Sequence, residues 1–282
     1  MENDGPSRTA LATAYARAYH QVVDRPQVFT DPLAARLLGH TEEDLLELGR
    51  AGRLSDAVTN RHRRLFFAAR ARFAEDTVAA AVAGGVRQVV VLGAGLDTFA
   101  YRNPHRDLRV FEVDHPATQA WKRERLAVAG ISSPETVTFV PVDFETQALA
   151  TELESAGFSR AGSAVFVWLG VVYYLTPDAV RATLAYIAGQ GGAVEVVFDY
   201  LRSAVTEEER VHERARADRL AGIGEPLSSY FSPDGIAAEL AALGFTGVED
   251  CSGPDLIAGC GGVFDGPPLP ALHVLRMLRA SR

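Results

Sequence analysis

From residue 88 onward, short runs of apolar, mostly β-branched residues alternate with longer stretches whose apolar positions recur every three or four residues. The short runs predict buried β-strands, and the longer stretches predict amphipathic helices. The predicted strands cover residues 88–92, 109–113, 137–142, 164–168 and 193–199. The predicted helices cover residues 116–129, 145–156 and 177–188. Continuous apolar strands separated by helices indicate a doubly wound α/β fold, in which helices cover both faces of a parallel sheet.

The C-terminal part follows a different pattern. Residues 233–243 predict a helix, and the segments GFTGVEDC and ALHVLRML predict two strands. A loop rich in glycine and proline, residues 253–270, joins these strands without a predicted helix between them. Consecutive strands of this kind indicate an antiparallel pair at one edge of the sheet. Five parallel strands closed by such a pair resemble the Rossmann-like, seven-stranded sheet of class I methyltransferases.

Helical patterns dominate the residues that precede the first strand. They cover residues 9–22, 32–38 and 54–83. No linker rich in proline, serine or glycine separates them from the sheet. Residues 1–87 are therefore expected to pack over the α/β core as a helical cap and not as an independent domain.

The remaining segments complete a single predicted domain. Residues 88–200 are predicted to form the α/β core, and residues 236–282 the C-terminal helix with the antiparallel strand pair. Between them, residues 201–235 contain a strongly charged helical stretch followed by Gly222 and Gly224. A charged helix beside a glycine hinge is typical of a lid, which we predict for this segment.

Composition and charge narrow the class of protein. The 282 residues are 48% hydrophobic and 23% charged, and the net charge of −8 argues against non-specific binding of nucleic acid. No apolar run approaches the roughly 20 residues that span a bilayer, and the first residues do not resemble a signal peptide. The two cysteines, Cys251 and Cys260, have no zinc-ligand spacing, so no metal site is predicted. We expect a cytoplasmic protein that binds neither nucleic acid nor membranes.

The first predicted strand leads directly into a glycine turn, in the sequence VVVLGAGLDTFAYR. Gly93 and Gly95 allow the backbone to approach a ligand closely at the carboxyl end of the sheet. The dinucleotide-binding fingerprint requires a third glycine where this chain has Thr98. The turn therefore predicts a nucleotide-like ligand, and it disfavours an NAD-linked oxidoreductase without removing that alternative.

Acidic residues end the next two predicted strands. Asp114 follows Gly95 by about 20 residues, which is the spacing expected for a carboxylate that binds ribose hydroxyls. Glu112 points to the same side of the strand and is the competing candidate. Asp143 offers a carboxylate for an exocyclic amine, and Phe144 offers an apolar face for a purine ring. Together with the glycine turn, these acids predict a site for adenosine.

Four segments, RARFAED, LGAGLDTFAYR, FEVDHP and VPVDFE, together resemble the leucine carboxyl methyltransferase superfamily. They are most similar to its bacterial branch of S-adenosylmethionine-dependent methyltransferases, many of which act in natural-product pathways. The resemblance extends from about residue 8 to the C-terminus. It implies S-adenosylmethionine as the cofactor and methyl transfer to a small-molecule or peptide acceptor as the reaction.

The resemblance also assigns roles within the cofactor site. Arginines in the helix before the glycine strand and in the first helix hold the methionine carboxylate, which implies Arg70 and Arg17. A planar guanidinium suits this carboxylate because it donates two parallel hydrogen bonds. Asp114 binds the ribose, while Asp143 and Phe144 frame the adenine. The implied site is completed by Gly93, Ala94, Gly95 and Trp168.

The chain departs from the family at the end of the fourth strand. Many members carry Trp-Glu-Gly there, whereas this chain has Leu169 in place of the glutamate. The acidic contact is either missing or supplied from elsewhere. The departure suggests a sub-branch with its own substrate, and it keeps a non-catalytic, cofactor-binding member as an alternative.

The acceptor is constrained by the chemistry of methyl transfer, an in-line displacement that depends on alignment of the reacting atoms. A carboxylate is already ionised at pH 7, whereas a phenol needs a base. No motif marks such a base, which favours a carboxylate over a phenolic hydroxyl. Candidates for the acceptor pocket are Tyr173, Tyr174, His20, His62 and Tyr230, although a histidine at either position is more often an ordinary surface or packing residue. An anionic substrate could be attracted by Arg61, Arg63 and Arg64, which otherwise form a solvated helix face.

Overall fold

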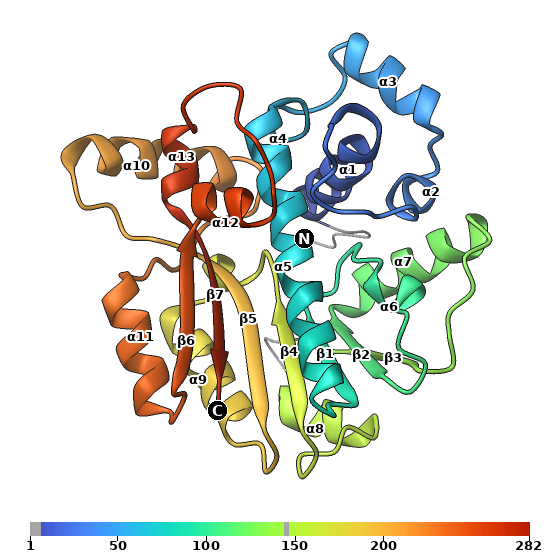
Figure 1. The fold of residues 1–282 in the computed structure, drawn as a ribbon, viewed down its shortest axis with the longest axis vertical. Helices are drawn as coiled ribbons and strands as arrows, with labels where there is room; N and C mark the ends of the chain where they lie inside the picture. Colours follow the sequence, from blue (N-terminus) through green and yellow to red (C-terminus); the bar gives the residue numbers. More distant parts are fainter. Residues whose placement is uncertain (1–6, 144–146) are drawn as a thin grey trace.

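The computed structural model describes residues 7–143 and 147–282, in which seven strands form one sheet (Figure 1). The strands are β1 (Gln88–Leu92), β2 (Arg109–Asp114), β3 (Val137–Pro141), β4 (Ala164–Trp168), β5 (Val194–Leu201), β6 (Gly247–Ser252) and β7 (Leu275–Ser281). Their order is β3-β2-β1-β4-β5-β7-β6. The first five run parallel, and β7 pairs antiparallel with both β5 and β6. The predicted seven-stranded, Rossmann-like sheet is confirmed.

Helices surround this sheet. The longer ones are α1 (Arg8–Val23), α3 (Glu42–Arg50), α5 (Arg61–Ala83), α7 (Pro116–Val128), α9 (Pro177–Ala188), α10 (Glu207–Ala221) and α11 (Pro233–Ala242). The shorter ones are α2 (Ala34–Leu38), α4 (Asp56–Thr59), α6 (Phe99–Arg102), α8 (Leu149–Ser155), α12 (Gly253–Gly259), α13 (Pro270–His273) and the 3₁₀ turn η1 (Val172–Tyr174). Within the described residues, no helix is both long and apolar enough to cross a bilayer.

Side chains that alternate along the strands divide the core into two layers. Val90 and Phe166 pack on one face with apolar residues of α8, α9 and α11. Val89 and Val165 point to the opposite face, where α5 and α12 cover them. The central strands β1 and β4 are buried at every position and, apart from Gln88, apolar throughout, which explains the continuous runs in the sequence.

Two sequence predictions about the helices were wrong. The predicted helix at residues 54–83 is broken at Asn60, whose side chain accepts a hydrogen bond from the Arg63 N–H and so begins α5 as an N-cap. The predicted loop at residues 253–270 contains α12, and α13 covers its last residue and the first three residues of the predicted strand ALHVLRML. Ser252 caps α12, and Leu256 and Ile257 bury this short helix in the layer formed by α5. This segment therefore forms a short helix because Leu256 and Ile257 can be buried against α5.

The N-terminal helices α1 to α4 lie together at one end of the sheet, and α10 lies at the same end (Figure 1). The Arg17 guanidinium of α1 donates through Nη2 to the Leu96 carbonyl, 2.7 Å away, in the segment after β1. This contact places α1 over the carboxyl ends of the parallel strands. The described part of α10 has no buried residue. The division of the chain into cap, core and lid stays a prediction.

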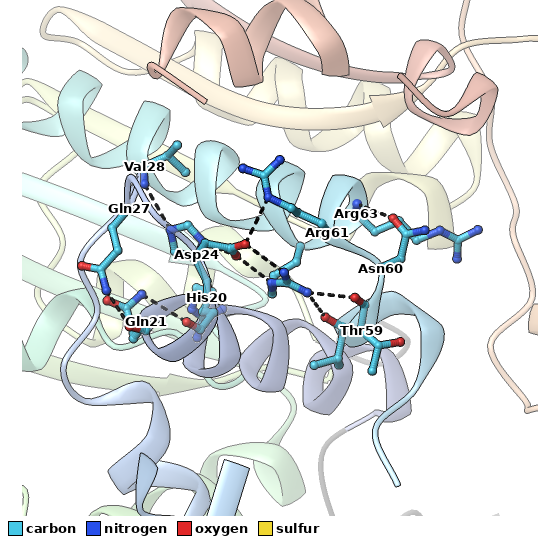
Figure 2. Close-up of polar contacts among 12 residues, drawn as sticks. His20, Gln21, Asp24, Gln27, Val28, Thr59, Asn60, Arg61 and Arg63 are labelled. Atoms are coloured by element: carbon cyan, nitrogen blue, oxygen red, sulfur yellow. Dashed lines mark hydrogen bonds and ion pairs between the residues drawn. The ribbon is translucent and has the colours of Figure 1, made fainter. Parts of the chain in front are cut away.

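A buried carboxylate joins α1 to α5 (Figure 2). Asp24, at the end of α1, accepts hydrogen bonds from Nε and Nη2 of Arg64 at 2.6 and 2.8 Å. It also accepts from Nδ1 of His20 at 2.8 Å. Burial alone would raise the pKa of Asp24, but the bonds from Arg64 and His20 lower it to about 2. The ionised form of Asp24 is therefore the one that the fold stabilises.

Asp24→Asn is expected to lower the free energy of unfolding by about 3–5 kcal/mol, because it leaves the buried Arg64 guanidinium without its counter-charge. Urea denaturation at pH 7 measures this loss. In the unsubstituted protein, the contribution of Asp24 is complete above its usual pKa of 3.8 and disappears as the pH falls towards about 2.

The matched control is Asp76→Asn, which breaks an exposed aspartate–arginine pair with Arg72 on α5. Such a surface pair contributes no more than about 1 kcal/mol. Equal losses for the two variants would contradict the structural role of Asp24.

Candidate functional site

A cavity of about 270 Å³ lies at the carboxyl ends of β1, β2 and β4 and is covered by α1 and α5. We call it the first cavity. The predicted cofactor-binding residues that line it are Arg17, Arg70, Gly93, Ala94, Gly95 and Asp114. These residues come from four separate elements of the chain, and the fold brings them together at the position that the strand order predicts for a ligand.

The glycine turn forms the floor of the first cavity. Gly93 has a φ of +64° and Gly95 a φ of +45°, a backbone region that other residues rarely adopt. A Cβ atom on Gly93 would lie only 2.3 Å from Cγ2 of Val171. Thr98, which replaces the third glycine of the dinucleotide fingerprint, donates its buried hydroxyl to Asp31 at 2.8 Å. At the position of the third glycine, this chain therefore has a side chain that ties the turn to Asp31 by a hydrogen bond.

Asp114 lies at the edge of this floor. Its carboxylate accepts hydrogen bonds from the N–H groups of Gly95 and His115. Burial raises the pKa of Asp114, although both N–H groups act in the opposite direction. The competing Glu112 does not line the cavity, because its carboxylate is buried against Nζ of Lys122 at 2.9 Å. Asp114 is therefore the acid of β2 that lines the first cavity.

Two arginines form the opposite wall of the first cavity. Nε of Arg17 donates to Asp31 at 3.1 Å, which anchors α1 above the glycine turn. Nη1 of Arg70 lies 2.6 Å from Oδ2 of Asp199. Burial alone would lower the pKa of Arg70, but the Asp199 carboxylate outweighs this effect and the pKa is raised. The guanidinium groups of Arg17 and Arg70 thus both line the cavity, and each is paired with an aspartate.

Asp199, which the sequence analysis did not single out, contacts the cavity-lining residues Arg70 and Gly170 without lining the cavity itself. It belongs to β5, is fully buried and accepts a hydrogen bond of 2.6 Å from the Gly170 N–H through its second oxygen. Gly170 follows Leu169, the residue that replaces the family glutamate. An acid from the neighbouring strand therefore occupies this region in place of one from β4. The signal in the sequence was the acid within the otherwise apolar run VVFDYL.

Two predicted cofactor residues, Trp168 and Asp143, do not line the first cavity. Trp168 is only 1% exposed and packs on Phe198 in the core, because alternation along β4 sends Val167 and Leu169 towards the cavity instead. Asp143 lies outside the cavity lining, and its N–H donates to Gln147 at 3.0 Å. Phe144 lies outside the described residues.

A larger cavity of about 510 Å³ adjoins the first. We call it the second cavity. The two cavities share Thr9, Phe67 and Tyr174. Tyr173 and Tyr174, both predicted near the acceptor, line the second cavity. The Tyr174 hydroxyl donates to Oγ1 of Thr9 at 3.1 Å, and burial raises the pKa of Tyr174 to about 12.

The remaining acceptor candidates line neither cavity. His20 is buried, with Nδ1 donating to Asp24 and Nε2 accepting from the Val28 N–H (Figure 2). His62 is paired with Asp265 through Nε2 at 3.1 Å, and its ring packs on Phe264. The buried hydroxyl of Tyr230 has no hydrogen-bond partner within the described residues. Both histidines are therefore occupied by structural contacts.

Asp199→Asn is expected to lower the free energy of unfolding by about 3–5 kcal/mol, since the buried Arg70 loses its counter-charge. In the double variant Arg70→Gln/Asp199→Asn, no unpaired charge remains, so the loss is expected to be smaller than the sum of the two single losses. Urea denaturation of the four proteins measures this coupling. Additive losses would show that the pair is not a coupled unit.

Comparison with known proteins identifies the family. Residues 10–188 match the family model described as leucine carboxyl methyltransferase. The chain is 30% identical over 283 residues to the "Putative S-adenosyl-L-methionine-dependent methyltransferase YktD" of Bacillus subtilis, with 91% of each chain covered. A protein of the same description from Parafrankia sp. is 36% identical over 181 residues, 62% of this chain and 56% of the relative.

The fold agrees with this assignment. The crystal structure of a "putative methyltransferase" from Thermobifida fusca has a TM-score of 0.57 and 17% identity, and it covers all of this chain and 96% of its own. The alternative of an NAD-linked oxidoreductase is therefore wrong. The chain belongs to the leucine carboxyl methyltransferase family and is an S-adenosylmethionine-dependent methyltransferase.

Proposed function

We propose that this enzyme methylates an oxygen atom of a small molecule or peptide in secondary metabolism, and that a carboxylate is the acceptor. The observation that carries the proposal is the junction of the two cavities at Thr9, Phe67 and Tyr174. The first cavity holds the residues suited to the cofactor, while the second is larger and mainly apolar. An acceptor in the second cavity would meet the cofactor at this junction.

The residues of the first cavity fit S-adenosylmethionine. Arg17 and Arg70 offer guanidinium groups to the carboxylate of its methionine moiety. The glycine turn allows close backbone approach, and Asp114 offers carboxylate oxygens to the ribose hydroxyls. Asp143 and Phe144 stay proposed for the adenine. When bound, this cofactor supplies an electrophilic methyl group on a positively charged sulfur.

The chemistry of the junction supports a carboxylate acceptor. None of the three shared residues is a base at neutral pH, because Tyr174 has a pKa of about 12 and the others are a hydroxyl and a phenyl ring. A carboxylate is ionised without help at this pH. The contribution of these side chains would then be to orient the acceptor oxygen and exclude water.

One observation favours a phenolic acceptor as the second candidate. The Tyr174 hydroxyl donates to Thr9, and Oγ1 of Thr9 in turn donates to the Glu225 carboxylate. This chain of hydrogen bonds runs from the junction to an acid. It offers a route by which a proton from an acceptor hydroxyl could reach Glu225.

Asp114→Ala is expected to weaken the binding of S-adenosylhomocysteine about 10- to 100-fold, because hydrogen bonds to a charged group are lost. Isothermal titration calorimetry measures the dissociation constant, and circular dichroism checks the fold. The control is Asp107→Ala, which removes an exposed aspartate before β2. An unchanged dissociation constant for Asp114→Ala would remove this residue from the cofactor site.

The acceptor class is tested with pairs of carboxylic acids and phenols that share the same skeleton, by transfer of a labelled methyl group. Transfer to the carboxylic acids is expected, at a rate that changes little between pH 6 and 9 because the acceptor stays ionised. Transfer restricted to phenols, rising with pH and impaired by Glu225→Gln, would contradict the carboxylate proposal and support the relay.

A further inference from the structure

The second cavity combines an apolar wall with a cluster of arginines. Phe66, Phe67, Leu272 and Leu275 are among its apolar lining residues. Its charged lining consists of Arg8, Arg63, Arg216, Arg219 and Asp56. Four guanidinium groups and one carboxylate thus border a mainly apolar space, in a protein whose net charge is −8.

Three of these four arginines lie at the end of the second cavity that is remote from the first. Arg63, Arg216 and Arg219 also line a neighbouring pocket beside α10 and α13, whereas none of them lines the first cavity. The junction residues Thr9, Phe67 and Tyr174 show the opposite pattern, since none of them lines that neighbouring pocket. The second cavity therefore connects a junction end with an arginine end.

The charge at the arginine end is poorly compensated. Across residues 7–143 and 147–282, Arg216 and Arg219 make no hydrogen bond or ion pair, although both border the cavity. Arg63 pairs with Asp56 at 3.2 Å. Burial lowers the pKa of Arg216, and the charges of Arg219 and Arg63 lower it further, against the opposite effects of Tyr230 and Glu213.

The nearby acids are committed to other partners. Glu209 is held by Arg202 and by the N–H groups of Val205 and Thr206. Glu213 accepts a hydrogen bond of 3.0 Å from the Ala204 N–H. A bound anion would supply the counter-charge that Arg216 and Arg219 lack, and guanidinium groups bind oxyanions through charge-assisted hydrogen bonds.

We propose that the acceptor is an amphiphile whose apolar body fills the second cavity and whose distal anionic oxygen group, separate from the methylated atom, binds Arg216 and Arg219, with Arg63 beside them. This inference rests on the proposed placement of the acceptor in the second cavity. If the methylated group is itself a carboxylate, the substrate class is a compound with two acidic ends joined by an apolar segment. The arginine end then decides which end of such a molecule faces the cofactor.

The test measures binding of decanoate and of decanol, its neutral counterpart of equal chain length, by isothermal titration calorimetry on the full chain saturated with S-adenosylhomocysteine. Decanoate is expected to bind more tightly than decanol. The double variant Arg216→Gln/Arg219→Gln is expected to bind decanoate about 10-fold more weakly and decanol equally well. Arg216→Lys, which keeps the charge, is expected to retain most of the preference.

The matched control is Arg214→Gln, because Arg214 lies on the same helix with 62% of its side chain exposed and lines neither cavity. Unchanged decanoate binding in the double variant, or equal binding of decanol and decanoate by the unsubstituted protein, would overturn the inference. The binding test needs no methyl transfer. If decanoate binding depends on Arg216 and Arg219 but no O-methylation is found, only the proposed function is contradicted. If O-methylation is found but the double variant binds decanoate as well as the unsubstituted protein does, only this inference is contradicted.

Discussion

The arrangement of the first cavity depends on the position of two helices, and a buried carboxylate joins them. Arg17 belongs to α1 and Arg70 belongs to α5, so their guanidinium groups meet in one cavity only if both helices cross the carboxyl ends of the strands. Asp24 connects these helices through Arg64 and His20. Removing a charge from such a network is costly because its partner stays buried.

The same rule applies throughout the interior. Each of several buried acids faces a cation: Asp31 contacts Arg17, Glu112 contacts Lys122 and Asp199 contacts Arg70. Asp114 differs, because backbone N–H groups hold it and it lines the first cavity. Where a charged group borders a cavity and has no charged partner, we expect a ligand to supply the missing interaction.

The order of the strands and much of the lining of the first cavity could be predicted from the sequence. Continuous apolar runs define buried parallel strands, and the residues that follow them meet at one edge of the sheet, which identified the glycine turn and Asp114. Arg17 and Arg70 were identified through the family resemblance, and they line the same cavity. Trp168 was also predicted but does not line it, because its neighbours on β4 face the cavity while its own side chain faces the core.

The sequence by itself determined the fold class, the family and the glycine turn, since each is written in residues close together in the chain. Only the tertiary structure decided between Glu112 and Asp114, by burying Glu112 against Lys122. It also brought Asp199 of β5 beside Gly170 of the neighbouring loop. The arginines of α5 and α10 border one cavity although about 150 residues separate them. Side chains from distant segments meet in this way because the segments pack together, and because a buried charge requires an opposite charge beside it.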